Sequence, residues 1–514
     1  MSPRLDSVAT RSTPTTTTPA RAWLALAVLM LPVLLIAIDN TVLAFALPLI
    51  AEDFRPSATT QLWIVDAYSL VLAALLVPMG ALGDRVGRRR LLLIGATGFA
   101  AVSAAAAFAP TAGALVGARA LLGVFGAMLM PATLSLIRNI FTDDSARRLA
   151  IAIWASCFTA GAALGPITGG ALLEHFHWGA VFLVAVPILL PLLLLAPRLV
   201  PESRDPNPGP LDPISIALAL LAMAPSVWAI KSVAHDGFTG IALAAFGLGV
   251  VATTLFVWRQ NRSETPMLEM RLFRYAPFSS SVLANFLSVV GLIGLLFFLS
   301  QHLQLVLGLP PLMAGLVTLP GAVCSVIGGL AVVRLAQRYA PHSLIVIGLL
   351  LVAAGFALVL LFRNDLTVAA VIASLVTLEI GVGISQTVSN DTIVAAVPPA
   401  KAGAAAAVSE TAYELGAVIG TATLGTVLTA SYRSNIELPR GLSETAAAQA
   451  GESIGGATAV ANELPPEMAA RLLDSARTAF DSGIAPMAGI AIALTLIAVA
   501  VVIRAFRGRP TVGP

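Results

Sequence analysis

Long apolar runs dominate this chain of 514 residues. A segment of about 20 mostly apolar residues is long enough to cross a bilayer as a helix. Hydrophobic residues make up 58% and charged residues 11% of the sequence, whereas soluble domains carry about 25% charged residues. Because a lipid-spanning backbone must satisfy its own hydrogen bonds, the sequence predicts an all-α membrane protein with many spans.

Windows of about 20 residues predict fourteen transmembrane helices. They lie near residues 24–47, 62–82, 91–109, 113–137, 149–173, 178–197, 213–233, 239–258, 277–302, 312–333, 344–362, 367–390, 402–430 and 484–504. Both cysteines, Cys157 and Cys324, fall inside these spans and indicate no disulfide framework.

Lysines and arginines gather on one side of the predicted spans. Twenty-two lie on that side, against three in the short loops of the other side and four in the long loop 431–483. Basic loops stay in the cytoplasm, so both termini are expected there. Residues 1–21, rich in Thr and Pro, are expected to be a disordered tail, and residues 506–514 a second tail. The net charge of +3 is spread over loops, so we expect no nucleic-acid partner.

One decapeptide inside the span 149–173 places glycines four residues apart, at Gly161, Gly165 and Gly169, and ends on Gly170. Residues spaced by four share a helix face, so these glycines let a neighbouring backbone approach closely. Pro166 removes an amide donor and bends the helix. A bendable, closely packed helix suits a moving part of a transporter.

A second motif joins the spans 62–82 and 91–109. Its defining residues are Gly80, Asp84, Arg85, Gly87 and Arg88. A basic cytoplasmic loop explains the arginines but not the aspartate and the spaced glycines. Residues 80–90 resemble the signature loop of the major facilitator superfamily, and residues 161–170 resemble the span 5 motif of its proton-coupled exporters.

Further segments resemble the fourteen-span drug:proton antiporter family of that superfamily. They are residues 38–48, 63–68, 115–126 and 178–187. The first half is similar to multidrug pumps of the QacA/LfrA type. One departure lies at the start of span 7, where Ser215 follows Asp212 at the spacing at which the family has a glycine.

This resemblance implies two six-helix, pseudo-symmetric bundles, residues 22–200 and 276–505, with residues 201–275 as a linker that holds two extra spans. Internal repeats are therefore expected. Gly416 and Gly420 of span 13 repeat the spacing of the span 5 glycines.

Ionisable residues inside the predicted spans are the candidates for chemistry. They are five acids and one base: Asp39, Asp66, Arg119, Glu379, Glu410 and Glu414. A charge at the bilayer centre costs about 2.5–3.5 kcal/mol on insertion scales, so each needs a partner, water or a cationic ligand. Surplus carboxylates attract lipophilic cations and bind protons, whereas an anion carrier would hold surplus bases.

Asp39 is the favoured site for a proton or a cation, because a buried carboxyl exchanges one for the other. A carboxyl that only hydrogen-bonds backbone for packing is the alternative. Arg119 stays protonated, so we expect it near Asp39, where it modulates proton affinity or forms a purely structural ion pair. Asp66 and Glu379 are further candidates for proton or substrate binding.

Glu410 and Glu414 lie one helical turn apart, with Tyr413 beside them, and two such close carboxylates tend to share a proton. The resemblance supports them, since pumps of this family carry acids at this place. They face the substrate or its exit path, or they are solvated near the inner end of the span.

Two segments outside the spans complete the prediction. The resemblance implies that Asp84 is a gate residue at the cytoplasmic surface, and the start of span 13 near Lys401 is its hypothesised partner. In the loop 431–483 we expect helices at 443–452 and 465–480. Related pumps have a helical hairpin here that caps the outer vestibule; a passive spacer is the alternative.

The sequence shows no nucleotide-binding loop, metal-ligand cluster or nucleophile–base pair, so we expect a transporter without a cofactor. The resemblance implies a monomeric proton-coupled antiporter of the bacterial plasma membrane. Its partners would be the lipid bilayer, protons and lipophilic, mainly cationic drugs and dyes, such as ethidium, acriflavine, quaternary ammonium compounds and fluoroquinolones, exported by alternating access. The alternative is a fourteen-span exporter of an endogenous metabolite, lipid or siderophore.

Overall fold

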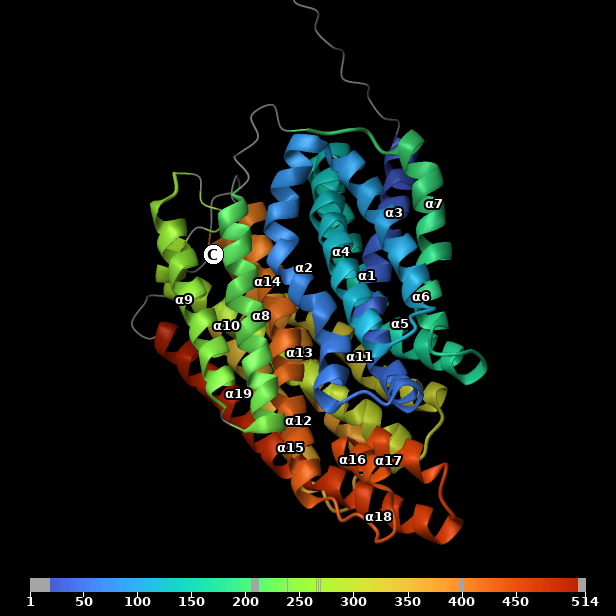
Figure 1. Cartoon of the computed structure of the whole chain (residues 1–514). Coiled ribbons are helices and arrows are strands. Elements are labelled where there is room, and N and C mark those ends of the chain that lie inside the picture. Colours follow the sequence, from blue (N-terminus) through green and yellow to red (C-terminus); the bar gives the residue numbers. More distant parts are fainter. Residues whose placement is uncertain are drawn as a thin grey trace, which may run out of the picture.

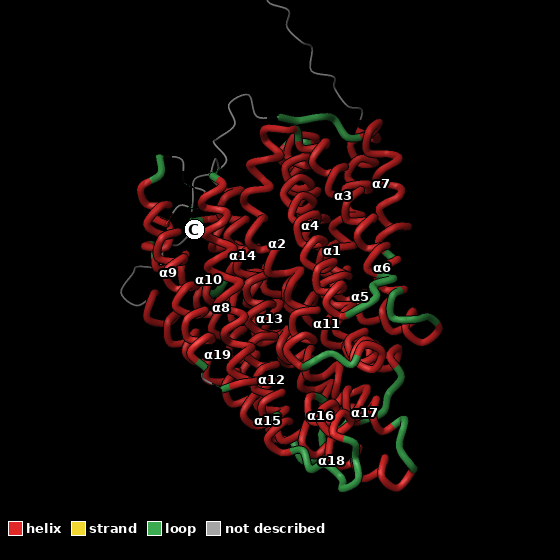
Figure 2. The backbone as a smooth tube through the Cα atoms, in the orientation of Figure 1, coloured by secondary structure: helices red, strands yellow, loops and turns green. Residues whose placement is uncertain are grey.

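The computed structural model describes residues 19–204, 212–237, 239–264, 266, 268, 270–396 and 402–506. Every regular element in these ranges is a helix (Figure 2). Fourteen helices of this part are long and apolar enough to cross a membrane, which confirms the predicted fold class and number of spans. Of the expected tails 1–21 and 506–514, residues 1–18 and 507–514 lie outside the described residues, as does Lys401. Residues 19–21 are helical and not part of a disordered tail, because α1 begins at Pro19, and Phe506 is the last residue of α19.

The helices follow one another along the chain with short connections (Figure 1). The first half and the linker contain α1 (Pro19–Phe54), α2 (Ala58–Val86), α3 (Arg88–Ala106), α4 (Ala112–Ile140), α5 (Asp144–His175), α6 (Ala180–Leu183), α7 (Ala185–Leu199), α8 (Pro213–Asp236), α9 (Gly240–Arg262) and the 3₁₀ helix η1 (Met270–Arg274).

The second half begins after η1. It contains α10 (Ala276–Gln301), η2 (His302–Val306), α11 (Pro311–Leu335), α12 (Pro341–Leu361), α13 (Val368–Ala395), α14 (Ala402–Gly420), η4 (Thr421–Gly425), α15 (Thr426–Asn435), α16 (Glu444–Glu452), α17 (Ile454–Ala461), α18 (Pro466–Ser482) and α19 (Ile484–Phe506). Both η2 and η4 are π-helical turns. Such turns often mark functional positions in helices.

Polar residues cap the helices at the ends of the apolar runs. The side chains of Ser57, Thr111 and Thr367 each accept a hydrogen bond from the backbone amide three residues further on. This contact satisfies one of the free amides at a helix N-terminus. The run of apolar residues and its cap together set where each helix begins.

Helix packing repeats between the two halves. In the first half α1 packs on α5 and α2 on α4; in the second half α10 packs on α14 and α11 on α13. The halves meet where α2 contacts α14 and where α5 contacts α11. This matched pairing is the pseudo-symmetry expected from the repeats. The exact domain boundaries 22–200, 201–275 and 276–505 stay a prediction.

The glycine motif of α5 seats this helix between both halves. A Cβ atom at Gly161 would lie 2.7 Å from the Cβ of Ala37 in α1, and one at Gly169 would lie 2.6 Å from Val42 Cγ2. A Cβ at Gly170 would instead lie 2.5 Å from Leu312 Cα in α11. The small residues therefore permit two close backbone approaches at once.

Gly416 and Gly420 of α14 make the equivalent approach to α10. A Cβ atom at Gly416 would lie 2.7 Å from the carbonyl oxygen of Phe286, and one at Gly420 would lie 2.6 Å from that of Val290. The sequence repeat between spans 5 and 13 thus corresponds to a repeat in packing.

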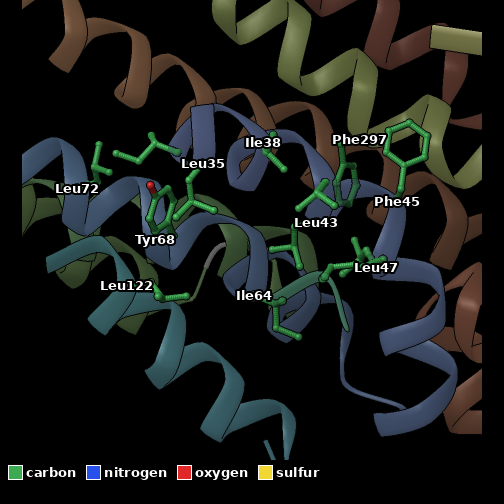
Figure 3. Packing of buried hydrophobic residues seen from close by; sticks show 14 of the residues in the cluster. Leu35, Ile38, Leu43, Phe45, Leu47, Ile64, Tyr68, Leu72, Leu122 and Phe297 are labelled. Carbon is green, nitrogen blue, oxygen red and sulfur yellow. The ribbon is translucent and has the colours of Figure 1, made fainter. Parts of the chain in front are cut away.

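The hydrophobic core runs across the boundary between the halves. Tyr68 of α2 and Leu122 of α4 belong to the same buried cluster as Phe45 of α1 and Phe297 of α10 (Figure 3). The Gln304 side-chain amide also donates to the carbonyl oxygen of Phe45 at 3.3 Å. These contacts hold the C-terminal part of α1 against α10 and η2.

The segment after α15 forms three helices, α16 to α18, at one end of the bundle (Figure 1). The helices expected at 443–452 and 465–480 are confirmed, and α17 is an additional one. Its Ile454, Ala457 and Val460 are buried, and it packs on α1 and α18. Tyr432 of α15 donates to the carbonyl of Ala450 at 2.7 Å. The segment is therefore packed against both halves of the bundle.

Candidate functional site

Asp39 of α1 and Arg119 of α4 form a buried ion pair. The distance from Arg119 Nη1 to Asp39 Oδ2 is 2.6 Å, and their side chains are 2% and 9% exposed, respectively. Arg119 also donates through Nε to the carbonyl of Ile64 at 3.2 Å, and its guanidinium carbon lies 4.5 Å from the ring centroid of Tyr68. The expected proximity of the two residues is found, and α2 supplies two further contacts that orient the arginine.

A second buried ion pair joins Asp66 of α2 to Lys231 of the linker helix α8. Lys231 Nζ lies 2.9 Å from Asp66 Oδ2 and 4.0 Å from the ring centroid of Trp63. The lysine side chain is 0% exposed. Cation–π contact and ion pairing together compensate the loss of water around the ammonium group.

Lys231 corrects one sequence prediction. The expectation of a single base among the buried charges is wrong, because Lys231 lies inside the bundle and not in an outer loop. The signal was its position within the predicted span 213–233. The linker helix therefore contributes directly to the charged centre of the first half.

Glu414 of α14 lies next to the first ion pair. It is 1% exposed, and its Oε1 accepts a hydrogen bond from the amide of Asn40 at 3.2 Å. Since Asn40 follows Asp39 in α1, this bond connects the second half to the Asp39 position. Glu410 lies one turn before Glu414 on the same helix. Within the described residues, neither glutamate forms an ion pair with a base.

Two cavities meet at Tyr413. One of about 20 Å³ is lined by Asn40, Asp66 and Arg119, among others. The other, of about 90 Å³, is lined by Glu379 of α13, among others. Tyr413 lines both cavities, and its ring packs edge-to-face on Phe158, with centroids 5.8 Å apart. Asp66 and Glu379 therefore line neighbouring cavities, and Asp39 and Glu414 are connected to the first of them through Arg119 and Asn40. Glu410 lines neither cavity.

Neither cavity can hold a drug in this state, since pockets for drug-sized ligands measure about 300–1,000 Å³. Glu379 is 8% exposed, and its cavity also contains the hydroxyl and amide groups of Ser325 and Gln386. The Glu379 cavity is therefore small and mainly apolar, with one buried carboxyl group in its wall.

The signature loop forms a clamp at the opposite end from α16–α18. Arg88 Nη2 lies 2.7 Å from Asp84 Oδ1, so the aspartate pairs inside its own motif. Gly87 adopts a φ of +112°, a conformation that glycine allows at low cost. A Cβ atom there would lie 2.8 Å from the carboxyl of Glu202. The hypothesised partner near Lys401 lies outside the described residues.

Glu202 was not predicted to take part in this clamp. Its carboxyl oxygens accept from the backbone amides of Arg89 at 3.0 Å and Arg90 at 3.2 Å, at the N-terminus of α3. An acid at a helix N-terminus is favourable, because the free amides carry partial positive charge. Gly80, at the other side of the motif, lies in α2 beside Pro131 of α4.

Asp212 begins the linker hairpin. It caps α8 by accepting from the amide of Ser215 at 3.1 Å and from the Ser215 hydroxyl at 2.6 Å, so the serine in place of the family's glycine completes the cap. Arg259 of α9 donates to both carboxylate oxygens, at 2.8 and 2.9 Å. The Arg259 guanidinium and the Ser215 bonds hold the pKa of Asp212 well below its usual range.

The comparison with protein families agrees with this architecture. Residues 29–421 match the model of the Major Facilitator Superfamily. The chain belongs to the Major Facilitator Superfamily. Members of this superfamily are membrane transporters, so the protein is a transporter and not an enzyme.

Three relatives within the Major Facilitator Superfamily cover most of the chain. The chain is 74% identical to the multidrug efflux pump LfrA of Mycolicibacterium smegmatis, over 98% of this chain and 100% of the relative. It is 38% identical to the methyl viologen resistance protein SmvA of Salmonella typhimurium, over 90% and 93%. It is 32% identical to the tetracenomycin C resistance and export protein of Streptomyces glaucescens, over 97% and 94%.

Solved transporters of known structure share the fold. A bacterial homolog of the human lysosomal transporter Spinster, in an inward-facing and occupied conformation, superimposes with a TM-score of 0.65 at 18% identity, over 96% of this chain and 98% of the other. A peptide transporter of the POT family gives a TM-score of 0.62 at 15% identity, over 94% and 96%. At these identities the likeness concerns the fold alone.

Proposed function

We propose that this protein exports lipophilic, mainly cationic drugs and dyes in exchange for protons, by alternating access. The observation that carries the proposal is the surplus of buried carboxyl groups. Asp39 and Asp66 are each balanced by a base, whereas Glu379, Glu410 and Glu414 have no ion pair with a base among the described residues. Groups of this kind take a proton or an organic cation in turn.

The exchange requires that the carboxyl groups around Tyr413 bind a proton and a drug cation in turn. A proton neutralises a glutamate around Tyr413, and a drug cation is then released because its counter-charge is gone. When the proton leaves, the carboxylate attracts the next cation. Glu414 is the central group in this scheme, since Asn40 links it to α1 and Glu410 lies one turn away. Two close carboxyl groups titrate as a pair.

The two ion pairs have different proposed roles. Arg119 favours the ionised form of Asp39. When Asp39 takes a proton, the arginine keeps its contacts with the carbonyl of Ile64 and the ring of Tyr68, so its charge is not left without partners. Asp66, expected as a proton or substrate group, is here neutralised by a lysine, and protonating it would leave that buried lysine charge unpaired. We therefore propose that Asp66 positions α8 and that Glu379, Glu410 and Glu414 bind protons and cations.

Two motifs provide the moving parts: the glycine motif of α5 and the signature loop that joins α2 to α3. Gly161, Gly165, Gly169 and Gly170, with Pro166, let α5 shift between α1 and α11. The clamp of Asp84, Arg88 and Glu202 fixes the ends of α2 and α3 in the present state. Names of the relatives support the substrate class, since two of them concern drug export and one concerns methyl viologen, an organic cation.

We propose that both termini lie in the cytoplasm, as the positive loops favour. We also propose a monomer in the bacterial plasma membrane that needs no cofactor beyond the proton gradient. The test uses the purified full chain in vesicles, with ethidium as the probe and an imposed pH gradient. We expect ethidium to move against the proton flow in the wild type and in Glu437→Gln, an exposed control, but not in Glu414→Gln. Ethidium movement that ignores the pH gradient, or equal movement in both variants, overturns the proposal.

A further inference from the structure

A cavity, called the wedge below, lies between part of the linker hairpin and the rest of the bundle. α8 contacts α2, η4 and α15 as well as α9, whereas the contacts of α9 are concentrated on α8 and η1. Between the hairpin and the bundle lies a cavity of about 520 Å³. Its walls include Ala219, Ala222 and Phe256 of the hairpin and Ala73, Phe286 and Leu415 of the bundle.

The cavity is apolar and lies away from the carboxyl groups. None of its lining residues carries a charge. Ala412 and Leu415 of α14 line it, whereas Tyr413 of the same helix lines the two acidic cavities. The wedge and the acidic region thus lie on different faces of α14. A lipophilic cation would find no counter-charge in this space.

Two arginines of η1 flank a residue that lines the wedge. Phe273 of η1 lines the cavity. In a 3₁₀ helix, side chains three residues apart are aligned, so Arg271 and Arg274 share a face that differs from that of Phe273. Both are exposed, and neither forms an ion pair within the described part of the chain. A third arginine, Arg262, stacks on Trp258 near the end of α9, with 4.5 Å from guanidinium carbon to ring centroid.

We propose that the wedge is a binding site for an anionic phospholipid. One acyl chain fills the apolar space between α8, α9, α10 and α14, and the phosphate is held by Arg271 and Arg274. Guanidinium groups suit phosphate because they donate two parallel hydrogen bonds. Basic positions between transmembrane helices, at the level of the headgroups, are typical of such lipid sites. Exposed apolar residues of α9, including Leu248, Val251 and Leu255, bring this hairpin into contact with the bilayer from which the acyl chain would enter.

A bound lipid would support α14, the helix that carries Glu410 and Glu414. It would fill a space that otherwise leaves one face of this helix without packing partners. Lipid binding can be measured without transport and independently of the exported substrate.

The binding test uses the purified full chain in detergent and follows its unfolding temperature. We expect phosphatidylglycerol to raise the unfolding temperature of the wild type more than phosphatidylethanolamine does. Arg271→Gln with Arg274→Gln should lose this difference, and added salt should weaken it in the wild type. Arg440→Gln with Arg471→Gln, two exposed arginines at the other end of the molecule, is the matched control and should retain it.

A second measurement locates the lipid. A phosphatidylglycerol with a photoactivatable acyl chain should label peptides of α8, α9 and α10, and the label should fall in Ala222→Leu, which narrows the wedge. Even labelling around the whole perimeter overturns the proposal, as does equal stabilisation by glycerol phosphate, which has no acyl chain. Loss of the label on addition of ethidium would show that the wedge binds the drug and would also overturn the lipid assignment.

Discussion

Lys231 of the linker helix α8 lies 2.9 Å from Asp66 of α2, and both side chains are buried. The ammonium group also faces the ring of Trp63. An ion pair therefore connects α8, one of the two extra helices, to the first half of the protein. This helix is part of the charged centre and not a passive insertion.

This pair predicts a rescue. Lys231→Met and Asp66→Asn should each lower the stability by about 3–5 kcal/mol, since each leaves one buried charge without its partner. The double variant should recover stability and most of the ethidium export, because no charge is then unpaired. Chemical denaturation of the purified protein and export from vesicles measure the two effects. A double variant that is stable but inactive would show that Asp66 itself binds a proton or substrate.

The Asp39–Arg119 pair predicts that export depends on the shape of the basic side chain at position 119. Arg119→Lys keeps the charge but loses the planar group that contacts Tyr68 and the carbonyl of Ile64. A hydrogen bond to a charged group contributes about 1.5–3 kcal/mol, so we expect export to fall roughly tenfold or more. Asp39→Asn should abolish pH-driven export. The amount of folded protein in the membrane is the control, and unchanged export in Asp39→Asn would remove this residue from the mechanism.

The glycines of α5 predict a steric effect at one position. A Cβ atom at Gly165 would meet the Thr41 hydroxyl and lie 3.0 Å from the carbonyl of Ile38. Gly165→Ala should therefore push α5 away from α1 and reduce export. Gly489→Ala is the matched control, because no atom lies within 4 Å of its added Cβ. There, alanine should stabilise the helix by about 0.8–1.0 kcal/mol. Equal export by both variants would contradict the close-packing role of the motif.

The lowered pKa of Asp212 predicts how its contribution to the stability of the protein depends on pH. Its pKa is lowered in the folded protein, so its contribution to stability is complete above the unfolded value of about 3.9 and is lost as the pH falls through the folded pKa. Asp212→Asn should lower the unfolding temperature at pH 7, and the difference from wild type should shrink as the pH falls below about 4. A difference that stays constant from pH 7 to pH 3 would contradict this ionic role.

Several features of the site were predictable from the sequence. A buried arginine needs a partner, which predicted that Arg119 lies near Asp39, and their contact is found. Glu410 and Glu414 share a helix face through their spacing alone. By contrast, the additional helix α17 was missed because its eight residues include two glycines and three β-branched residues, which lower the helix propensity.

The fourteen spans, their caps and the surplus of acids were determined along the chain, because apolar run length and helix capping depend on residues close in sequence. Tertiary packing decided which charges are neutralised. Lys231 reaches Asp66, Glu202 reaches the start of α3, and Tyr413 separates two cavities only because of how the helices are rotated and placed against each other. Spacing along the sequence carries no record of such rotations, whereas the cost of an unpaired charge in lipid depends on them directly.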